Sequence, residues 1–263
     1  MPEGDTVFVA ATRLHRALAG NTLTKTDFRV PAIATVDLSG RELVEVVSRG
    51  KHFLFRIEGG TTFHCHFKMD GEWHLYRPGT RPRGPEHTIR AILGTEQWTA
   101  VGFHLAMTEL VPTAEEERVV GHLGPDPLTA WDAPEALRRM RQHGERPIGE
   151  ALLDQTVMAG PGNVYKCEIC FLRGVDPWTP VGDVPDIEGL VDLTARLMQA
   201  NRKTGTQVTT GDDRPGRGRW VYGRGGKPCR RCGTPIQRKG QDPGGERVTY
   251  WCPSCQPPRA RAS

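Results

Sequence analysis

The sequence predicts an α+β protein of several domains, and three observations lead to that prediction. Residues 22–110 contain short apolar or alternating segments separated by Gly and Pro, which is typical of antiparallel strands. From about residue 124 to residue 201 the apolar residues recur with a helical period. Two Cys-x-x-Cys pairs near the carboxyl end have the spacing of a zinc-binding β-hairpin. We therefore expect a β-sandwich domain with a flanking helix over residues 1–112, a helical domain over 113–215 and a zinc finger over 216–263.

The length and the charge of the chain set its broad class. At 263 residues the chain can bury a full core, and two domains with a small appendage are expected. No apolar run approaches the roughly 20 residues of a membrane span, and the polar-faced amino-terminal segment is unlike a signal peptide. Residues 201–263 hold 14 Lys and Arg against 4 Asp and Glu, whereas residues 1–200 hold 21 against 27. A basic tail on an acidic chain indicates a polyanionic partner, most simply nucleic acid.

The expected secondary structure begins with a helix. Gly4, Asp5 and Thr6 are interpreted as a turn and N-cap, because the apolar period starts directly after them and Gly20 marks the helix end. The strand-like segments that follow are 22–30, 42–48, 52–57, 61–67, 87–93 and 104–111. The helix-like segments of the next region are 133–142, 147–155, 163–172 and 187–201. Residues 202–226 have no apolar period, so we expect a loop there.

Pro2 and Glu3 give the amino terminus its chemistry. Once Met1 is removed, Pro2 carries a secondary amine, and an α-amino group titrates near pH ~8, so a usable fraction is nucleophilic at neutral pH. Attack of a secondary amine on a carbonyl gives an iminium ion, the electron sink of Schiff-base chemistry. Glu3 is placed to act as acid or base beside it. The alternative is that Pro2 marks only the removal of Met1, which is the commoner meaning of Pro at this position.

The strand region contains three features that allow either a functional or a purely structural interpretation. Lys51 follows Gly50 at a turn into a strand and would project toward a ligand, although an ordinary solvated charge is the commoner case. His64 and His66 share one face of a strand, as a metal pair does, but no third ligand is identifiable nearby, so core or surface histidines are favoured. Met69, at a strand end, fits either a core filler or an exposed apolar wedge for a base step.

The helical region contains a Gly-rich turn from Gly160 to Asn163 that opens onto a helix. Main-chain N–H groups in such a turn, together with the Asn163 side chain, suit a phosphate oxygen. A helix corner without a ligand explains the turn equally well. Cys167 and Cys170 fall inside the following helix, and we interpret both thiols as buried packing.

The four cysteines near the carboxyl end give the strongest local signal. Cys229 and Cys232 are followed, after nineteen residues, by Cys252 and Cys255. This spacing is typical of a four-thiolate zinc site that holds a β-hairpin. Few apolar residues surround it, so zinc must supply folding free energy, and four filled positions make its role structural. Basic residues on the hairpin, Arg247 among them, suit a nucleic-acid contact.

The order of these motifs resembles, over essentially the full length, that of the bacterial family of formamidopyrimidine-DNA glycosylase and endonuclease VIII. The motifs are Met1-Pro2-Glu3-Gly4-Asp5-Thr6, Arg49-Gly50-Lys51-His52, His122-Leu123-Gly124-Pro125-Asp126-Pro127-Leu128, Gly160-Pro161-Gly162-Asn163-Val164-Tyr165, Trp220-Val221-Tyr222-Gly223-Arg224 and the four-cysteine finger. The opening Glu3-Gly4-Asp5-Thr6 is similar to the endonuclease VIII branch, since the purine-specific branch usually has Glu-Leu-Pro-Glu.

This resemblance implies a fold and an activity. The fold consists of a β-sandwich, a helix–two-turns–helix DNA-binding domain and a finger with one structural Zn²⁺. The activity is that of a bifunctional DNA glycosylase and abasic-site lyase of base excision repair, which removes oxidised bases and nicks the strand by β,δ-elimination. The implied partner is damaged double-stranded DNA, with single-stranded or bubble DNA left open. We expect a monomer in the bacterial cytoplasm, associated with the nucleoid and without membrane contact.

The resemblance also implies roles for individual residues. Pro2 would attack C1′ of the flipped nucleotide, and Glu3 would protonate the deoxyribose ring oxygen. Lys51 would bind phosphate or the ring region near the lesion. Asn163 and Arg247 would hold the phosphates that flank the extruded nucleotide.

Two positions depart from the family pattern. Met69 lies where the family places a residue that fills the gap left by base flipping. Its neighbours Lys68 and Asp70 are not the usual void-filling partners, so only Met69 is assigned that role. Pro161 stands where the family usually has Ile, which stiffens the turn before Asn163.

Other functions compete with this interpretation. A non-catalytic zinc-finger DNA-binding protein on the same scaffold is disfavoured by the intact Pro2, Glu3 and Lys51. A tautomerase with an N-terminal Pro needs neither the finger nor the basic tail. A purine-preferring enzyme for 8-oxoguanine is the third alternative. We expect oxidised pyrimidines to be preferred, because non-planar bases stack poorly and residues 204–218 offer no bulky apolar side chain to sandwich a purine.

Overall fold

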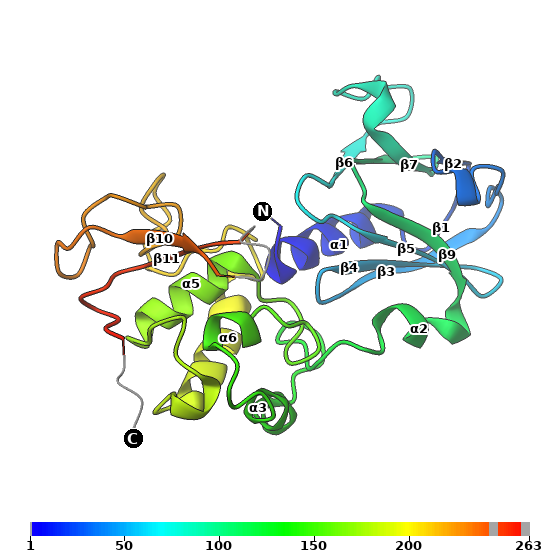
Figure 1. The fold of residues 1–263 in the computed structure, drawn as a ribbon. Coiled ribbons are helices and arrows are strands. Elements are labelled where there is room, and N and C mark those ends of the chain that lie inside the picture. Colours follow the sequence, from blue (N-terminus) through cyan, green and yellow to red (C-terminus); the bar gives the residue numbers. More distant parts are fainter. Residues whose placement is uncertain (1, 242–246, 259–263) are drawn as a thin grey trace. The chain divides into compact units, whose positions relative to one another are not determined.

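The computed structural model describes residues 2–241 and 247–258 and divides into two compact units, one up to His122 and one from Leu123 onward. The first unit consists of two antiparallel sheets, helix α1 (Gly4–Leu18) and the short helix α2 (Glu117–Val120) (Figure 1). The five-stranded sheet has the order β1 (Asn21–Thr22), β3 (Glu42–Arg49), β4 (His52–Ile57), β5 (Thr61–His66) and β9 (Met107–Pro112). The four-stranded sheet has the order β2 (Lys25–Phe28), β7 (Ile89–Gly94), β8 (Thr99–Phe103) and β6 (Glu72–Tyr76). The predicted sandwich with a flanking helix is confirmed.

One apolar cluster joins both sheets to α1. Phe53 and Phe55, two residues apart in β4, are completely buried in this cluster, as are Leu14 of α1 and Leu93 of β7. Burial of side chains of this size supplies most of the free energy that holds such a sandwich together. The apolar alternation in the sequence therefore corresponds to the inner face of the sandwich.

The start of α1 differs from the expected turn and N-cap. Gly4, Asp5 and Thr6 are already helical, Glu3 is the N-cap residue, and the Val7 N–H donates to the Glu3 carbonyl at 3.0 Å. Acidic residues in the first turn complement the positive end of the helix dipole, so the helix extends to include Asp5. Pro2 consequently lies two residues before the first helical residue.

Strands β6 and β8 were not expected from the sequence. β8 is a central strand that pairs with both β6 and β7. A Cβ atom at Gly102 of β8 would lie 2.5 Å from Leu105 and 3.0 Å from Trp73, so the packing there requires glycine. Because β8 is short and contains glycine, its sequence does not show the pattern that is typical of a strand. The expected strand at 104–111 begins only at Met107, because His104 has a left-handed φ of 49°.

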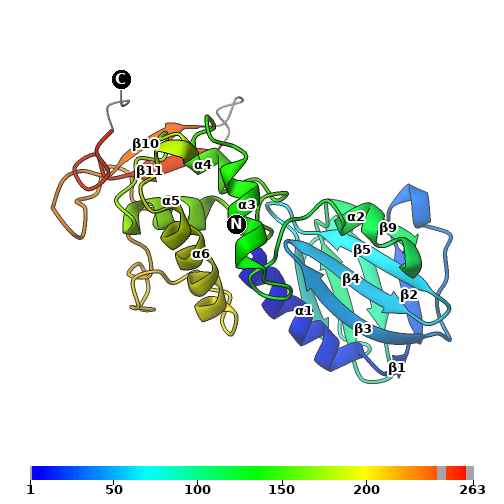
Figure 2. The same ribbon diagram turned by 90° about the horizontal axis from the view of Figure 1, so that it is seen from below.

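The second unit is helical, with α3 (Ala133–Arg141), α4 (Ile148–Ala151), α5 (Asn163–Leu172) and α6 (Ile187–Asn201) (Figure 2). The helix expected at 147–155 is only one turn long, because the Asp154 carboxylate accepts the Thr156 N–H at 2.9 Å and forms a turn. Short 3₁₀ helices lie at Pro31–Ile33, Glu86–Thr88, Thr113–Glu115 and Val181–Asp183.

The same unit ends in the antiparallel hairpin β10 (Gln237–Gly240) and β11 (Val248–Trp251). Helix α5 packs directly against β11. No helix in the described part of the chain is long and apolar enough to cross a membrane. The division at residues 112 and 215 into three domains stays a prediction.

Candidate functional site

Pro2 and Glu3 lie at the positive end of α1. Pro2 is half-buried, the Glu3 side chain is buried, and the fifteen-residue helix begins directly after them. Main-chain N–H groups and the helix dipole favour an anion at such a position. Pro2 therefore directly precedes the N-cap residue of a rigid helix, and the side chain of that N-cap residue carries a carboxyl group.

Lys51 occupies the turn between β3 and β4. Arg49 pairs with His52 across this turn, and Gly50 between them has a φ of 57°, a left-handed conformation that glycine adopts without strain. Helix α1 packs on both β3 and β4, so the same two strands support Pro2 and the Lys51 turn.

His52, the residue after Lys51, belongs to a hydrogen-bonded series of side chains on the outer face of the five-stranded sheet. The His64 Nδ1 lies 3.0 Å from the Glu109 Oε1, and the His64 Nε2 lies 2.8 Å from the His52 Nδ1. An ionised carboxylate only accepts hydrogen bonds, so Glu109 assigns the His64 proton to Nδ1. The His64 Nε2 then accepts from the His52 Nδ1–H. His64 and His66 are thus a buried and a partly buried histidine in a network, as favoured from the sequence.

Burial keeps His52 and His66 uncharged. Desolvation, followed by the charges of His66 and His64, lowers the pKa of His52 to about 3. Desolvation, followed by the charge of Lys51, lowers the pKa of His66 to about 4. Both rings are therefore neutral at neutral pH, and neither adds a positive charge beside Lys51.

Met69 lies in the turn after β5 with 59% of its surface exposed. The turn is tight, because the Gly71 N–H donates to the Phe67 carbonyl at 3.0 Å and a Cβ at Gly71 would meet the Phe67 backbone at 2.6 Å. Lys68 adopts a left-handed φ of 50° in the same turn. An exposed apolar side chain on a tight turn suits a wedge and excludes the core-filler interpretation.

The Gly-rich turn before α5 offers fewer main-chain donors than expected. The Gly160 N–H donates to the Gln155 side chain at 2.9 Å, and Gln155 in turn donates to the Pro161 carbonyl at 2.9 Å. Pro161 itself has no N–H. The turn is therefore pinned by Gln155, and Asn163, the first residue of α5, is its principal candidate for a phosphate contact.

Asn163 and Arg247 are neighbours through the hairpin. The Asn163 Nδ2 donates to the Val248 carbonyl at 2.9 Å, which fixes the helix against the residue after Arg247. The Asn163 Oδ1 is buried without a hydrogen-bond partner among the described residues. Arg247 is exposed. The structure thus brings these two candidates together in the second unit, while Pro2, Glu3, Lys51 and Met69 belong to the first.

The four finger cysteines form a metal-binding group. Their sulfur atoms all lie within 4.8 Å of one another, and no other group of described residues is arranged to hold a metal. The Sγ atoms of Cys232 and Cys252 are 3.5 Å apart, and those of Cys229 and Cys255 are 4.0 Å apart. Both separations are too long for a disulfide. A tetrahedron with Zn–S bonds of ~2.3 Å has edges of about 3.8 Å, so the four residues fit zinc.

The protonation of these thiols also suits a cation. Hydrogen bonds from Thr234 lower the pKa of Cys232 to about 6, whereas burial and the neighbouring thiols raise the pKa of Cys255 to about 12. Four thiolates this close cannot all ionise without a cation between them. Zinc binding must therefore release protons, and it would hold together the segments on either side of the hairpin. By contrast, Cys167 and Cys170 are completely buried in α5, as expected.

Glu168 is a functional candidate that the sequence did not reveal. It is completely buried on α5, yet its carboxylate accepts the main-chain N–H groups of Trp220 (2.7 Å), Val221 (2.8 Å) and Tyr222 (2.8 Å). The Thr209 hydroxyl donates to it as well. Glu168 therefore closes the base of the loop that runs from Thr209 to Trp220. A glutamate between two cysteines in an apolar helix was the available signal.

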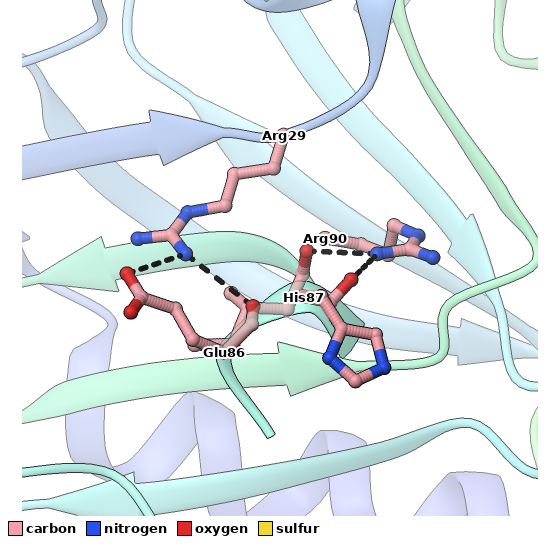
Figure 3. A pocket seen from close by; sticks show the side chains of 5 residues that line it. Arg29, Glu86, His87 and Arg90 are labelled. Carbon is pink, nitrogen blue, oxygen red and sulfur yellow. Dashed lines mark hydrogen bonds and ion pairs between the residues drawn. The ribbon is translucent and has the colours of Figure 1, made fainter. Parts of the chain in front are cut away.

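An open pocket on the four-stranded sheet has no comparable chemistry (Figure 3). Its Arg29 is paired with Asp27 at 3.0 Å and with Glu86 at 3.3 Å. Its Arg90 donates to the carbonyls of His87 and Ile89. Since these cations already have protein partners, the pocket is not a catalytic candidate.

Family models match three parts of the chain. The formamidopyrimidine-DNA glycosylase N-terminal domain matches residues 1–108, and the H2TH domain of the same glycosylase matches residues 123–210. A zinc finger found in FPG and IleRS matches residues 226–258.

Individual proteins match over the whole length. The chain is 54% identical over 261 residues to a protein named probable endonuclease 8 2 from Streptomyces coelicolor, covering 97% of this chain and 94% of that one. It is 48% identical over 257 residues to a protein named DNA-(apurinic or apyrimidinic site) lyase Nei2 from Mycolicibacterium smegmatis, covering 97% and 99%. Among solved structures, Lactococcus lactis Fpg in complex with DNA containing N7-benzyl-Fapy-dG superposes with a TM-score of 0.80 at 23% identity, covering 98% of this chain and 100% of that one. This last likeness concerns the fold.

The lowered pKa values of His52 and His66 predict a loss of stability in mild acid. In the unfolded chain a histidine titrates near pH ~6.5, above the folded pKa of His52 and His66, so the unfolded state binds more protons below that pH. The free energy of unfolding is highest above pH ~6.5. It decreases as the pH falls toward the folded pKa values, by up to about 2 kcal/mol per histidine at pH ~5. Urea unfolding at a series of pH values should show this slope. His52→Phe should flatten it and His87→Gln, at an exposed site, should not; an equal slope in all three proteins would contradict the assignment.

The finger predicts one zinc per chain with Cys252 as a ligand. Cys252→Ser should lose the metal and weaken DNA binding, because the hairpin that carries Arg247 has too small an apolar core to fold without it. Elemental analysis of the purified protein and of this variant tests the expectation. Cys170→Ala removes a thiol outside the group and should keep its zinc; retention of zinc by Cys252→Ser would show that the ligand set is wrong.

Proposed function

Because the chain belongs to the formamidopyrimidine-DNA glycosylase family, we infer that it is a DNA glycosylase with abasic-site lyase activity that acts in base excision repair. The family models span the sandwich, the helical region and the finger. Relatives at 48–54% identity are named as endonuclease 8 and as an abasic-site lyase. The partner we propose is damaged double-stranded DNA, bound by a monomer in the bacterial cytoplasm and at the nucleoid.

The observation that carries the mechanism is the placement of Pro2 and Glu3 at the positive end of α1. We propose that the Pro2 nitrogen attacks C1′ of the damaged nucleotide, so that a C–N bond to the protein forms as the bond to the base breaks. Glu3 gives a proton to the ring oxygen, the sugar opens and an iminium ion results. The iminium makes the C2′ hydrogens acidic, and loss of one C2′ proton expels the 3′ phosphate. Loss of a second proton, from C4′ of the conjugated iminium, then expels the 5′ phosphate. Water finally releases Pro2.

The remaining candidates hold the DNA in this proposal. Lys51, on its glycine-supported turn, meets a phosphate or the sugar ring near the lesion. Asn163 and Arg247 hold the flanking phosphates, where charge-assisted hydrogen bonds are strong. Met69 enters the gap that the extruded nucleotide leaves, which its exposure on a tight turn favours.

An alternative within the same family is a preference for 8-oxoguanine. The base of the loop from Thr209 to Trp220 is closed by Glu168, and residues 210–219 between these ends are small, polar or charged, with no large apolar side chain to cover a purine. Oxidised pyrimidines such as thymine glycol stack poorly, so extruding them costs less free energy. We propose oxidised pyrimidines as the preferred substrates.

Covalent trapping tests the role of Pro2. Borohydride should reduce the iminium and leave a protein–DNA adduct whose peptide map places the link at residue 2. An N-terminal tag that blocks the amine should abolish base removal. Glu3→Gln should lower it by at least about two orders of magnitude, the usual contribution of a general acid. DNA binding should survive in both. Unchanged trapping by the protein with a blocked amino terminus would contradict the role of Pro2. Loss of all trapping in the parent protein would leave the non-catalytic DNA-binding function as the alternative.

Single-turnover excision on matched duplexes tests the substrate preference. Thymine glycol and hydroxylated or dihydroxylated pyrimidines should be released faster than 8-oxoguanine opposite cytosine. The physical reason is the smaller cost of unstacking a non-planar base, which is a part of the few kcal/mol that flipping requires. A faster rate for 8-oxoguanine than for every pyrimidine lesion would reverse the assignment.

A further inference from the structure

Lys166 is an unexpected residue in the second unit. It lies in the first turn of α5, three residues after Asn163, and it is completely buried. A buried amine loses its hydration, and a cation in the first turn opposes the helix dipole. Two unfavourable terms at one position require compensation from specific partners or from a bound anion.

Specific partners connect Lys166 to the finger hairpin. The Lys166 Nζ donates to the Thr249 Oγ1 at 2.5 Å, and the Thr249 hydroxyl donates to the Gln241 Oε1 at 2.8 Å. The Gln241 Nε2 donates to the Pro177 carbonyl at 2.6 Å, which fixes the orientation of that amide. Every donor in this chain points in the same direction, away from Lys166. A polar chain so fully satisfied in a buried setting holds its members in one arrangement.

This chain reaches the backbone on which Arg247 stands. The Gln241 N–H donates to the Arg247 carbonyl at 3.3 Å, and Thr249 follows Arg247 by two residues in β11. Helix α5 touches β11 at successive positions, since Asn163 binds the Val248 carbonyl and the Tyr250 N–H donates to the Cys167 sulfur at 3.4 Å. Lys166 supplies the middle one of these three contacts.

A second observation concerns the Asn163 side chain, whose oxygen has room for a hydrogen-bond donor from a group that binds beside it. The Asn163 side chain is only 5% exposed, and its Oδ1 has no hydrogen-bond partner among the described residues. A buried acceptor without a donor costs free energy, and an arginine that moves in to share a phosphate with Asn163 would supply that donor.

We propose that Lys166 is a positioning residue for the phosphate clamp of Asn163 and Arg247, an inference that rests on the function proposed above. Through Thr249 and Gln241 it fixes the backbone that presents Arg247. Its charge adds to the positive end of α5 and so favours the same phosphate. Lys166 itself does not touch DNA in this arrangement.

The test uses the full-length zinc-bound protein and a duplex that contains a tetrahydrofuran abasic analogue. Lys166→Met keeps the length of the side chain and removes its charge and donors. We expect dissociation constants about tenfold higher, while the single-turnover lyase rate on abasic DNA at saturating protein stays within about twofold. Lys25→Met, at an exposed site in the first unit, is the control for loss of one positive charge and should bind within about twofold of the parent.

A double-mutant cycle separates positioning from general destabilisation. If Lys166 acts through Arg247, Lys166→Met combined with Arg247→Ala should bind no more weakly than Arg247→Ala alone. Full additivity of the two losses would overturn the inference. An unchanged affinity of Lys166→Met beside a weakened Arg247→Ala would overturn it too and leave the clamp intact. Normal binding by Arg247→Ala and by Asn163→Ala would remove the clamp, and the inference with it.

Thr249 keeps the inference testable if Lys166→Met loses its zinc or its fold. Thr249→Ser retains the hydroxyl link and should bind like the parent, whereas Thr249→Val cuts both links and should weaken binding about tenfold. Parent-like binding by Thr249→Val, with zinc content at one per chain, would refute the role of the chain.

Discussion

The buried carboxylate of Glu168 fixes the loop that leads to the finger against helix α5. A buried carboxylate is tolerated only when donors replace its lost water, and here three consecutive main-chain N–H groups and a hydroxyl do so. Those N–H groups belong to a stretch without helix or strand, which would otherwise have to find acceptors elsewhere. The Glu168 side chain thus accepts the hydrogen bonds of the loop and fixes that loop to helix α5. The finger follows directly after this loop in the sequence.

Helix α5 carries two completely buried residues of opposite charge type, Glu168 and Lys166. Glu168 faces the loop, while Asn163 and Lys166 face the hairpin, so a single buried helix fixes both neighbouring segments. In the first unit a similar role falls to Arg56, which pairs with Glu45 at 2.6 Å and with Glu116 at 2.7 Å and connects β4 to the segment before α2. Buried and half-buried polar side chains, and not only the apolar core, therefore position the candidate site residues.

The sequence predicted those features whose chemistry is encoded locally. The helices at 163–172 and 187–201 have the expected bounds, because an apolar period and flanking Gly or Asp define them. The zinc group follows from the spacing of four residues. Features that depend on distant partners were missed: Gly102 is required by Trp73 and Leu105, and Glu168 meets donors more than forty residues away. The family resemblance assigned roles to Pro2, Glu3, Lys51, Asn163 and Arg247, and the packing explains how the backbone carries them.

The closure of the loop by Glu168 has a consequence for how this protein can evolve. The carboxylate holds main-chain N–H groups, which every amino acid except proline possesses, and it holds them only at the loop's base. Replacement, insertion or deletion of residues between Thr210 and Arg219 leaves that fastening in place. The loop can therefore change in sequence and in length while the helix and the finger that flank its base stay unchanged.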